Sequence, residues 1–253
     1  MTTLFRAENL AINFGGIKAV DGVTFDVEQG KVFTIIGPNG AGKTTVFNLI
    51  SRIYDPSEGK LIFEGRDITR VPPHDVAGIG IARTFQNIEL FEYATLLQNL
   101  LLGRHAHRGT NLIQDILHLP AARKSELAHR ERVEKVIEFL DLEAYRDALI
   151  MNLPYGVRKV VELARALCTE PKLLLLDEPS SGLNTEETQD MAFWIQDIKV
   201  ELGITVLMVE HDMSLVNEVS DRVLALNYGR VLAEGTAREV QSHPEVVKAY
   251  LGG

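Results

Sequence analysis

A glycine-rich segment in the first fifth of the chain has the residue types and the spacing that bind phosphate. Residues 37–45 read GPNGAGKTT and fit the pattern G-x-x-x-x-G-K-[ST]. Glycines here let backbone N–H groups turn toward phosphate oxygens, and a helix that follows adds partial positive charge at its N-terminus. Lys43 is placed to reach the β- and γ-phosphates, and the Thr44 hydroxyl to hold Mg²⁺. The predicted nucleoside triphosphate site consists of Gly37, Pro38, Asn39, Gly40, Ala41, Gly42, Lys43, Thr44 and Thr45.

The residues on either side of this loop favour a phosphate site over an ordinary glycine-rich turn. The apolar run Val32–Ile36 comes directly before it, and a helix-compatible run, 46–53, comes after it. Strand, loop and helix in that order are the context that the motif needs.

Two adjacent carboxylates follow another apolar run further along the chain. Leu173–Leu176 predicts a buried strand, and Asp177 and Glu178 come directly after it. We expect Asp177, at the strand tip, to hold Mg²⁺ through water, and Glu178 to polarise the attacking water. The pattern alone is weak, and its position downstream of the phosphate loop gives it weight.

Three continuous apolar runs, Val32–Ile36, Leu173–Leu176 and Ile204–Val209, predict parallel strands covered on both faces. Helical patterns separate them, so the fold class is α/β. Strand-like pieces at Leu10–Phe14 and 23–27 are broken by glycine-containing turns, and 60–63 continues that style. We interpret these pieces as an antiparallel β layer beside the parallel core.

Residues 87–150 predict an inserted lobe that is wholly helical. Val133, Val136, Ile137 and Leu140 follow the i, i+3, i+4, i+7 spacing of a buried helix face. Ser125 is the expected N-cap of that helix.

Composition excludes several classes of protein. The 253 residues carry a net charge of −9, which disfavours nucleic acid as a partner. The single cysteine, Cys168, cannot form an internal disulfide, so we expect a reducing compartment and a small core residue. The first residues lack the pattern of a signal peptide, and no apolar run is long enough to span a membrane. A membrane role would therefore depend on a partner.

The stretch before Asp177 resembles the ATP-binding cassette (ABC) ATPases. Residues 162–167, ELARAL, and the run LLLLDEP at 173–179 match that family well. Its Leu-Ser-Gly-Gly-Gln signature, which opens a helix, is altered here: Leu153 and Gly156 are retained. Pro154 replaces the usual Ser, Tyr155 the first Gly, and Val157 the Gln.

Four further positions agree with the resemblance. Gln86 matches the Q-loop glutamine, 181–184 resembles the D-loop, and His211 matches the switch histidine that contacts the γ-phosphate. Phe14 matches the aromatic residue that stacks on adenine. The alternatives are a core role for Phe14 and an ordinary polar strand end for His211.

The resemblance implies one ABC ATPase domain with a P-loop NTPase (RecA-like) core. The core would comprise 1–86 and 168–253, and the helical lobe 87–167 would carry the signature. ATP and Mg²⁺ are the implied ligands. The implied catalytic residues are Glu178, His211 and Gln86. The implied metal-binding residues are Thr44, Gln86 and Asp177. Leu153, Pro154, Tyr155 and Gly156 would contact nucleotide bound to a second, identical or paralogous subunit.

Within the family, the chain resembles the ATPases of branched-chain amino acid importers. The residues Arg83-Thr84-Phe85-Gln86, the long stretch between Leu102 and Val133, and the C-terminal residues 233–252 carry this likeness. It implies permease subunits as partners, an extracytoplasmic solute-binding protein acting indirectly, and a peripheral location on the cytoplasmic face of the membrane. An ATPase of lipopolysaccharide or lipid export and a soluble ATP-dependent switch protein are the alternatives.

Histidines and basic residues gather in the expected lobe. They are His105, His107, His118 and His129, with Arg104, Arg108, Arg123, Lys124, Arg130 and Arg132. Their spacing matches no familiar metal-ligand pattern, which favours a solvated helical face. A weaker hypothesis places this basic segment near anionic lipid headgroups.

Overall fold

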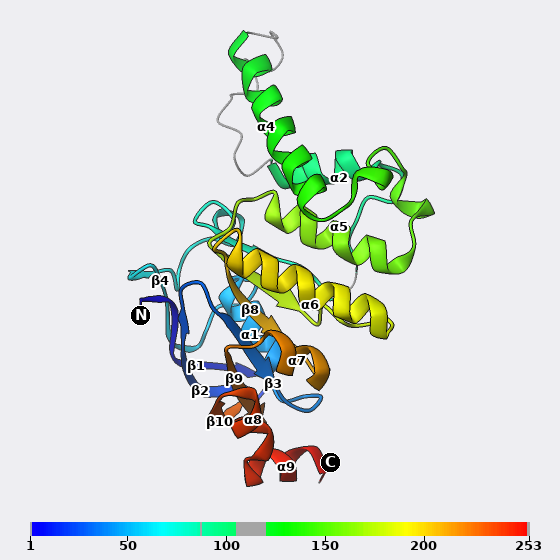
Figure 1. The fold of residues 1–253 in the computed structure, drawn as a ribbon. Helices are drawn as coiled ribbons and strands as arrows, with labels where there is room; N and C mark the ends of the chain where they lie inside the picture. Colours follow the sequence, from blue (N-terminus) through cyan, green and yellow to red (C-terminus); the bar gives the residue numbers. More distant parts are fainter. Residues whose placement is uncertain (1, 87, 105–119, 252–253) are drawn as a thin grey trace. The chain divides into compact units, whose positions relative to one another are not determined.

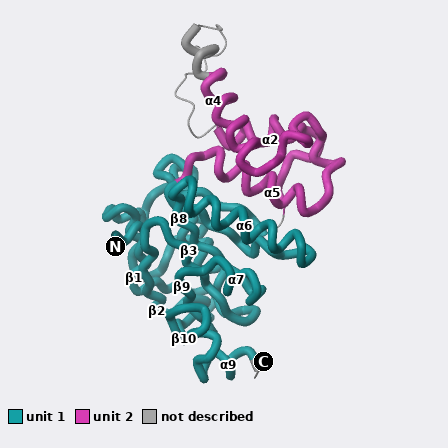
Figure 2. The backbone as a smooth tube through the Cα atoms, viewed as in Figure 1, with its two compact units in different colours: residues 1–86, 172–253 teal, residues 87–171 magenta. Residues whose placement is uncertain are grey.

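The structure, a computed structural model, describes residues 2–86, 88–104 and 120–251. The chain divides into two compact units, shown in two colours in Figure 2. Unit 1 comprises residues 1–86 and 172–253, and unit 2 comprises residues 87–171.

The central sheet of unit 1 has six strands in the order β10-β9-β3-β8-β7-β6. Strands β3, β8, β9 and β10 of this sheet are labelled in Figure 1. Its parallel strands are β3 (Val32–Ile36), β6 (Ile81–Arg83), β7 (Leu173–Asp177), β8 (Thr205–Val209) and β9 (Arg222–Asn227). Strand β10 (Arg230–Gly235) pairs antiparallel with β9 at one edge. Every residue of β3, β7 and β8 is buried, which confirms the parallel strands expected from continuous apolar runs.

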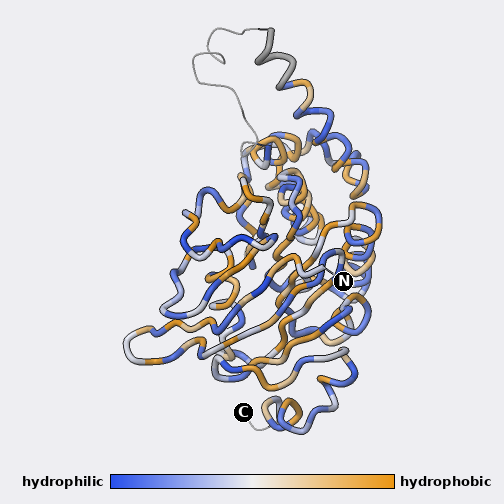
Figure 3. Tube along the Cα trace, turned by 90° about the vertical axis from the view of Figure 1, so that its left-hand side faces the viewer, coloured by the Kyte–Doolittle hydropathy of each residue, from blue (hydrophilic) through white to orange (hydrophobic). Residues whose placement is uncertain are grey.

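The second sheet of unit 1 is antiparallel, with the order β2-β1-β4-β5. Its strands are β1 (Thr3–Phe14), β2 (Ile17–Glu28), β4 (Glu58–Phe63) and β5 (Arg66–Asp67). Burial alternates along β2 from Val23 to Val27, whereas β1 contains the consecutive buried residues Leu10, Ala11 and Ile12. Figure 3 shows hydrophobic and hydrophilic segments interspersed along the chain. The expected antiparallel layer is therefore present, with strands longer than the sequence pattern indicated.

Helices pack on both sheets of unit 1. Helix α1 (Lys43–Ile50) contributes Val46, Phe47, Leu49 and Ile50 to a core shared with strands of both sheets. Helix α6 (Thr185–Val200) packs on β8 and on α7 (Met213–Val219). The remaining elements are η1 (Pro73–Asp75), α8 (Ala237–Ser242) and α9 (Pro244–Leu251).

In the described part of unit 2, the α-helices are α2 (Leu96–Gly103), α4 (Pro120–Phe139) and α5 (Tyr155–Leu167). Short 3₁₀ helices, η3 (Glu143–Tyr145) and η4 (Ile150–Asn152), lie between α4 and α5. An isolated β-bridge pairs Thr95 with Leu149. The prediction that residues 87–150 are wholly helical is therefore wrong.

The expected cap at Ser125 is wrong. Helix α4 begins at Pro120, which places Ser125 inside the helix. The stripe partners Val133, Ile137 and Leu140 are buried, as predicted.

Candidate active site

The phosphate-binding loop connects the end of β3 to the start of α1, as the sequence predicted. Gly42, the N-cap of α1, has φ = 101°, a conformation that L side chains rarely adopt. A Cβ at Gly42 would lie 2.6 Å from the Ala19 carbonyl oxygen, and one at Gly37 would lie 2.3 Å from the Leu226 oxygen. Neighbouring backbone therefore leaves no room for side chains at these two positions.

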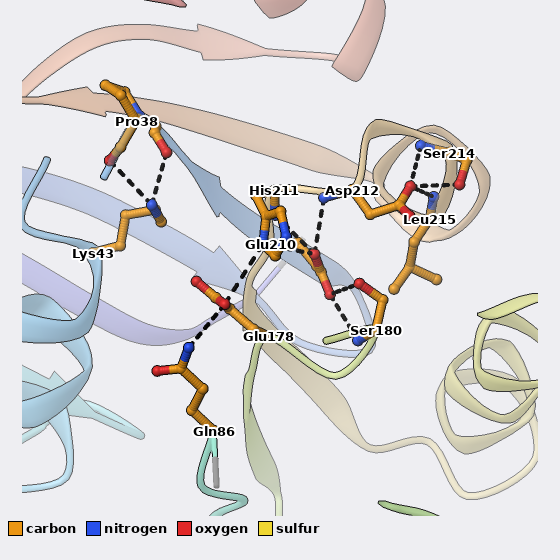
Figure 4. Close-up of polar contacts among 11 residues, drawn as sticks. Pro38, Lys43, Gln86, Glu178, Ser180, Glu210, His211, Asp212, Ser214 and Leu215 are labelled. Atoms are coloured by element: carbon orange, nitrogen blue, oxygen red, sulfur yellow. Dashed lines mark hydrogen bonds and ion pairs between the residues drawn. The ribbon is translucent and has the colours of Figure 1, made fainter. Parts of the chain in front are cut away.

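Lys43 lies at the first position of α1 and is buried. Its Nζ donates to the carbonyl oxygens of Gly37, at 2.7 Å, and Pro38, at 3.2 Å (Figure 4). Burial lowers the pKa of Lys43, and the negative charges of Glu178, Asp177 and Glu210 oppose that shift. The ammonium group thus sits under the loop, facing a group of carboxylates.

A cavity of about 420 Å³ opens above this loop. Its lining includes residues 39–45, Gln86 and Glu178. Ile17, Lys18, Ala19 and Tyr228 complete the wall, and Ile17 and Tyr228 are largely exposed. Phe14 is absent from the lining and packs edge-on against Tyr54, with ring centroids 5.2 Å apart. The cavity therefore presents Ile17 and Tyr228, and not Phe14, as the large apolar side chains of its wall.

Asp177 ends β7, and its two carboxylate oxygens have different surroundings. Oδ2 accepts a hydrogen bond of 2.7 Å from Arg83, in an ion pair that is almost fully buried. Oδ1 is buried and has no hydrogen-bond partner in the part of the chain that the structure describes. A buried carboxylate oxygen without a partner is costly, and a hard cation would satisfy it. Asp177 thus fits the Mg²⁺ role predicted for it.

Arg83 connects this carboxylate to the helix that follows the phosphate loop. Its guanidinium also donates to Asn48 Oδ1 in α1, at 2.8 Å, and to Ser51 Oγ at the end of α1, at 2.7 Å. It lies over the rings of Phe47 and Phe85. The strand that carries Asp177 and the helix that begins at Lys43 are therefore joined by one side chain.

Glu178 follows Asp177 with a left-handed backbone, φ = 50°. Such a conformation is uncommon outside glycine and is found at functional sites. Its N–H donates to the Val209 oxygen at the end of β8, at 2.9 Å. Its Oε2 accepts a bond of 3.1 Å from Gln86 and lies 3.6 Å from Nδ1 of His211 (Figure 4). The three predicted catalytic side chains are thus close together at one edge of the central sheet.

The altered signature lies at the start of α5 in unit 2. Leu153 is buried, and Pro154 is the N-cap residue and offers no side-chain hydrogen bond. Arg158 holds the preceding backbone, with Nε donating to the Leu153 oxygen at 2.8 Å and NH2 to the Met151 oxygen at 2.7 Å. Tyr155 is exposed at the first helical position.

The N-termini of α1 and α5 differ from other helix starts in the described chain. Helices α2, α6, α7 and α8 are capped by their own side-chain oxygens, from Thr95, Asn184, Asp212 and Thr236. Neither α1 nor α5 has a side-chain cap or an acidic residue in its first turn. The N-cap residues Gly42 and Pro154 thus offer no side-chain oxygen to these helix starts, which suits an anion.

The family model described as ABC transporter matches residues 20–181. The chain belongs to the ABC transporter family. A second model, described as branched-chain amino acid ATP-binding cassette transporter, matches residues 230–253 of this ABC protein.

Curated ABC relatives match the chain nearly end to end. The high-affinity branched-chain amino acid transport ATP-binding protein BraF of Pseudomonas aeruginosa is 41% identical over 98% of each chain. LivG of Escherichia coli, with the same description, is 36% identical over 98% of each chain. A solved ABC transporter cassette in its ADP conformation has a TM-score of 0.87 and 34% identity, covering 100% of both chains. The chain is an ABC transport ATP-binding subunit with a nucleotide site.

The predicted cluster of histidines and basic residues in the lobe is only partly described by the structure, and one of its members is buried. Arg104 is buried, donates to the Cys168 oxygen at 2.8 Å and pairs with Glu170, so it does not belong to an exposed basic face. Residues His105, His107, His118 and Arg108 lie outside the described residues. Over the described ranges, no cluster of three or more histidine, cysteine, aspartate or glutamate side chains could hold a metal ion, and no helix has the length and apolar character needed to cross a membrane.

Sequence reasoning missed the roles of Arg83 and Glu210. In the sequence, Arg83 stands out only as part of a family pattern, and Glu210 does not stand out at all. A charged residue inside or directly after a buried apolar strand is the signal that could have found both.

Proposed function

We propose that this ABC protein hydrolyses ATP to drive an importer of branched-chain or other hydrophobic amino acids. The observation that carries the proposal is its match, at 36–41% identity over 98% of each chain, to branched-chain amino acid transport ATP-binding proteins. The same relatives favour import over the alternatives of lipid export and a soluble ATP-dependent switch.

In this proposal, residues 37–45 bind the phosphates of ATP through the backbone of the loop and the start of α1. Lys43 releases the loop carbonyls and donates to phosphate oxygens instead. The base lies against Ile17 and Tyr228, which line the cavity, whereas Phe14, the sequence-based candidate for stacking, lies outside the lining.

Glu178 is the proposed general base, and its neighbours orient it. Gln86 donates to its Oε2, and His211 stands 3.6 Å away, positioned to contact the γ-phosphate. Asp177 Oδ1, Thr44 and Gln86 are the groups that would hold Mg²⁺. The cation, when bound, would supply positive charge that offsets the negative charge developing on the phosphates.

The proposed reaction needs a second copy of the cassette, identical or paralogous. The start of α5, with Leu153, Pro154, Tyr155 and Gly156, would dock on the γ-phosphate held by the other subunit's loop. Loss of the usual serine removes one donor, but the N–H of Gly156 and the helix dipole remain. The cassettes would close with ATP and open after hydrolysis.

The proposed partners are integral membrane permease subunits on the cytoplasmic face of the cell (inner) membrane. An extracytoplasmic solute-binding protein would act through them, and nucleic acid is not expected as a partner. To test this, the tagged chain is purified from its native membranes and the copurifying complex is placed in proteoliposomes. We expect integral membrane subunits to copurify and labelled leucine to accumulate only with ATP.

The Lys43→Ala variant is the matched control and should copurify without supporting uptake. If the wild-type chain copurifies with no membrane protein, or the complex moves lipid and no amino acid, the import proposal is wrong.

A further inference from the structure

Glu210 is a fully buried carboxylate that ends the apolar run of β8 and directly precedes His211. Its own N–H donates to the Ile35 oxygen at the end of β3, at 3.2 Å. The residue is therefore anchored to the central sheet at the same edge as the phosphate loop.

The two oxygens of Glu210 bind two different loops (Figure 4). Oε1 accepts from the N–H of Ser180, at 2.9 Å, and from the Ser180 hydroxyl, at 2.6 Å. Oε2 accepts from the N–H groups of His211, at 2.7 Å, and Asp212, at 3.0 Å. Four donors thus satisfy a charge that would otherwise be costly to bury.

These loops carry the two groups that must converge on the attacking water and the γ-phosphate. Ser180 lies two residues after Glu178, and the other loop begins with His211 itself. We propose that Glu210 is a positioning residue that holds the Glu178 loop and the His211 loop in register. This inference rests on the proposed ATPase function and adds a residue to its machinery.

A carboxylate is suited to this task because both of its oxygens accept hydrogen bonds. Glutamine has the same shape but replaces one oxygen with an NH₂ group. In Glu210→Gln that group would face N–H donors on one of the two loops, so only one loop stays bound. Glu210 also adds negative charge near Lys43, opposing the effect of burial on that lysine.

The decisive experiment perturbs one loop and measures the other. Ser180→Ala removes one of the bonds to Oε1 without changing residues 210–215. Hydrogen exchange of the full-length protein is measured in peptides covering 178–184 and 210–215. We expect Ser180→Ala to speed exchange in both peptides, by at least about threefold in 210–215.

Ser214→Ala is the matched control because its hydroxyl bonds Asp212 Oδ1 and not Glu210. It should leave exchange in 178–184 unchanged. If Ser180→Ala alters only 178–184, the two loops are not coupled and the proposal is overturned.

Kinetics separate positioning from simple stabilisation. We expect Glu210→Gln to lower kcat about tenfold or more, Ser180→Ala to lower it less, and KM for ATP to stay within about twofold in both. A lower melting temperature with unchanged kcat per folded molecule would mean a structural role only, and would overturn the proposal. If the wild-type chain hydrolyses no ATP, the proposed function is wrong. The exchange experiment still tests whether Glu210 couples the two loops, because it does not depend on hydrolysis.

Discussion

The N-termini of α1 and α5 are open to an anion in the same way but are held in different ways. Behind α1, Arg83 links the helix to the buried carboxylate of Asp177. Before α5, Arg158 binds two backbone carbonyls of its own loop. The start of α1 is thus tied to a charged network, and Arg158 ties the start of α5 to the backbone directly before it. In the proposed composite site, we therefore expect the phosphate loop to be the fixed half and the altered signature to be the adjustable half.

The largest expected effect tests whether both halves act on one ATP. Glu178→Gln removes the proposed base, so ATP hydrolysis should fall by about 10²–10⁴-fold. Bound ATP should then trap a dimer that elutes earlier on size-exclusion chromatography. A monomer with ATP and wild-type hydrolysis would show that α1 and α5 do not meet as proposed.

Replacing the two arginines compares the two supports directly. Arg83→Met leaves Asp177 as an unpaired buried carboxylate, which should lower the free energy of unfolding by about 3–5 kcal/mol. Arg158→Met removes bonds to carbonyls at a partly exposed site and should cost about 1 kcal/mol. Urea unfolding of both variants measures the difference. Equal losses would contradict the distinction between a fixed and an adjustable half.

A carboxylate at the start of α5 should prevent this helix from binding the γ-phosphate of ATP that the second subunit holds. Gly156→Asp places a negative charge in the first turn, where it suits the helix dipole but repels the γ-phosphate. ATP hydrolysis should fall about tenfold or more below that of Gly156→Ala, since like charges in contact cost several kcal/mol. Nucleotide binding to the isolated chain should be the same in both variants, as measured by fluorescent nucleotide titration.

Restoring the usual serine should have a smaller and opposite effect. Pro154→Ser returns a hydroxyl donor for phosphate, so kcat should rise by a few-fold, the value of about one hydrogen bond. Pro154→Ala, which has no hydroxyl, should show no gain. A rise in both variants would assign the effect to loss of the proline ring.

The smallest expected effect concerns the reactivity of Cys168, the C-cap residue of α5. Burial raises the pKa of Cys168 to about 12, and the nearby Arg104 opposes this in part. The thiol should therefore react slowly with iodoacetamide at pH 8 in the folded protein, and Gly156→Asp should not speed the reaction. Because the folded pKa lies above the unfolded value of 9.0, this thiol's contribution to stability is complete below pH 9 and is lost as pH rises toward 12.

Continuous apolar runs and a glycine-rich loop were enough to predict the buried strands, the phosphate loop and the placement of Asp177 and Glu178. The interactions that fix these residues were not predictable, because their partners are far apart in sequence. Arg83 and Asp177 are 94 positions apart, and Ser180 and Glu210 are 30 apart. The β9–β10 hairpin was also missed, although Tyr228-Gly229 at its turn is a signal for one.

The turn between β9 and β10 contacts the phosphate loop on the side where we propose that the base binds. Gly229 donates from its N–H to the Ala41 oxygen, and a Cβ at Gly229 would lie 2.6 Å from the Ala19 oxygen. Tyr228, on the same turn, forms part of the cavity wall. A protein engineer who repacks this turn to admit a different nucleobase would therefore also disturb the loop that grips the phosphates. In this cassette, we therefore expect a change in the proposed base contact to change the affinity for the phosphates as well.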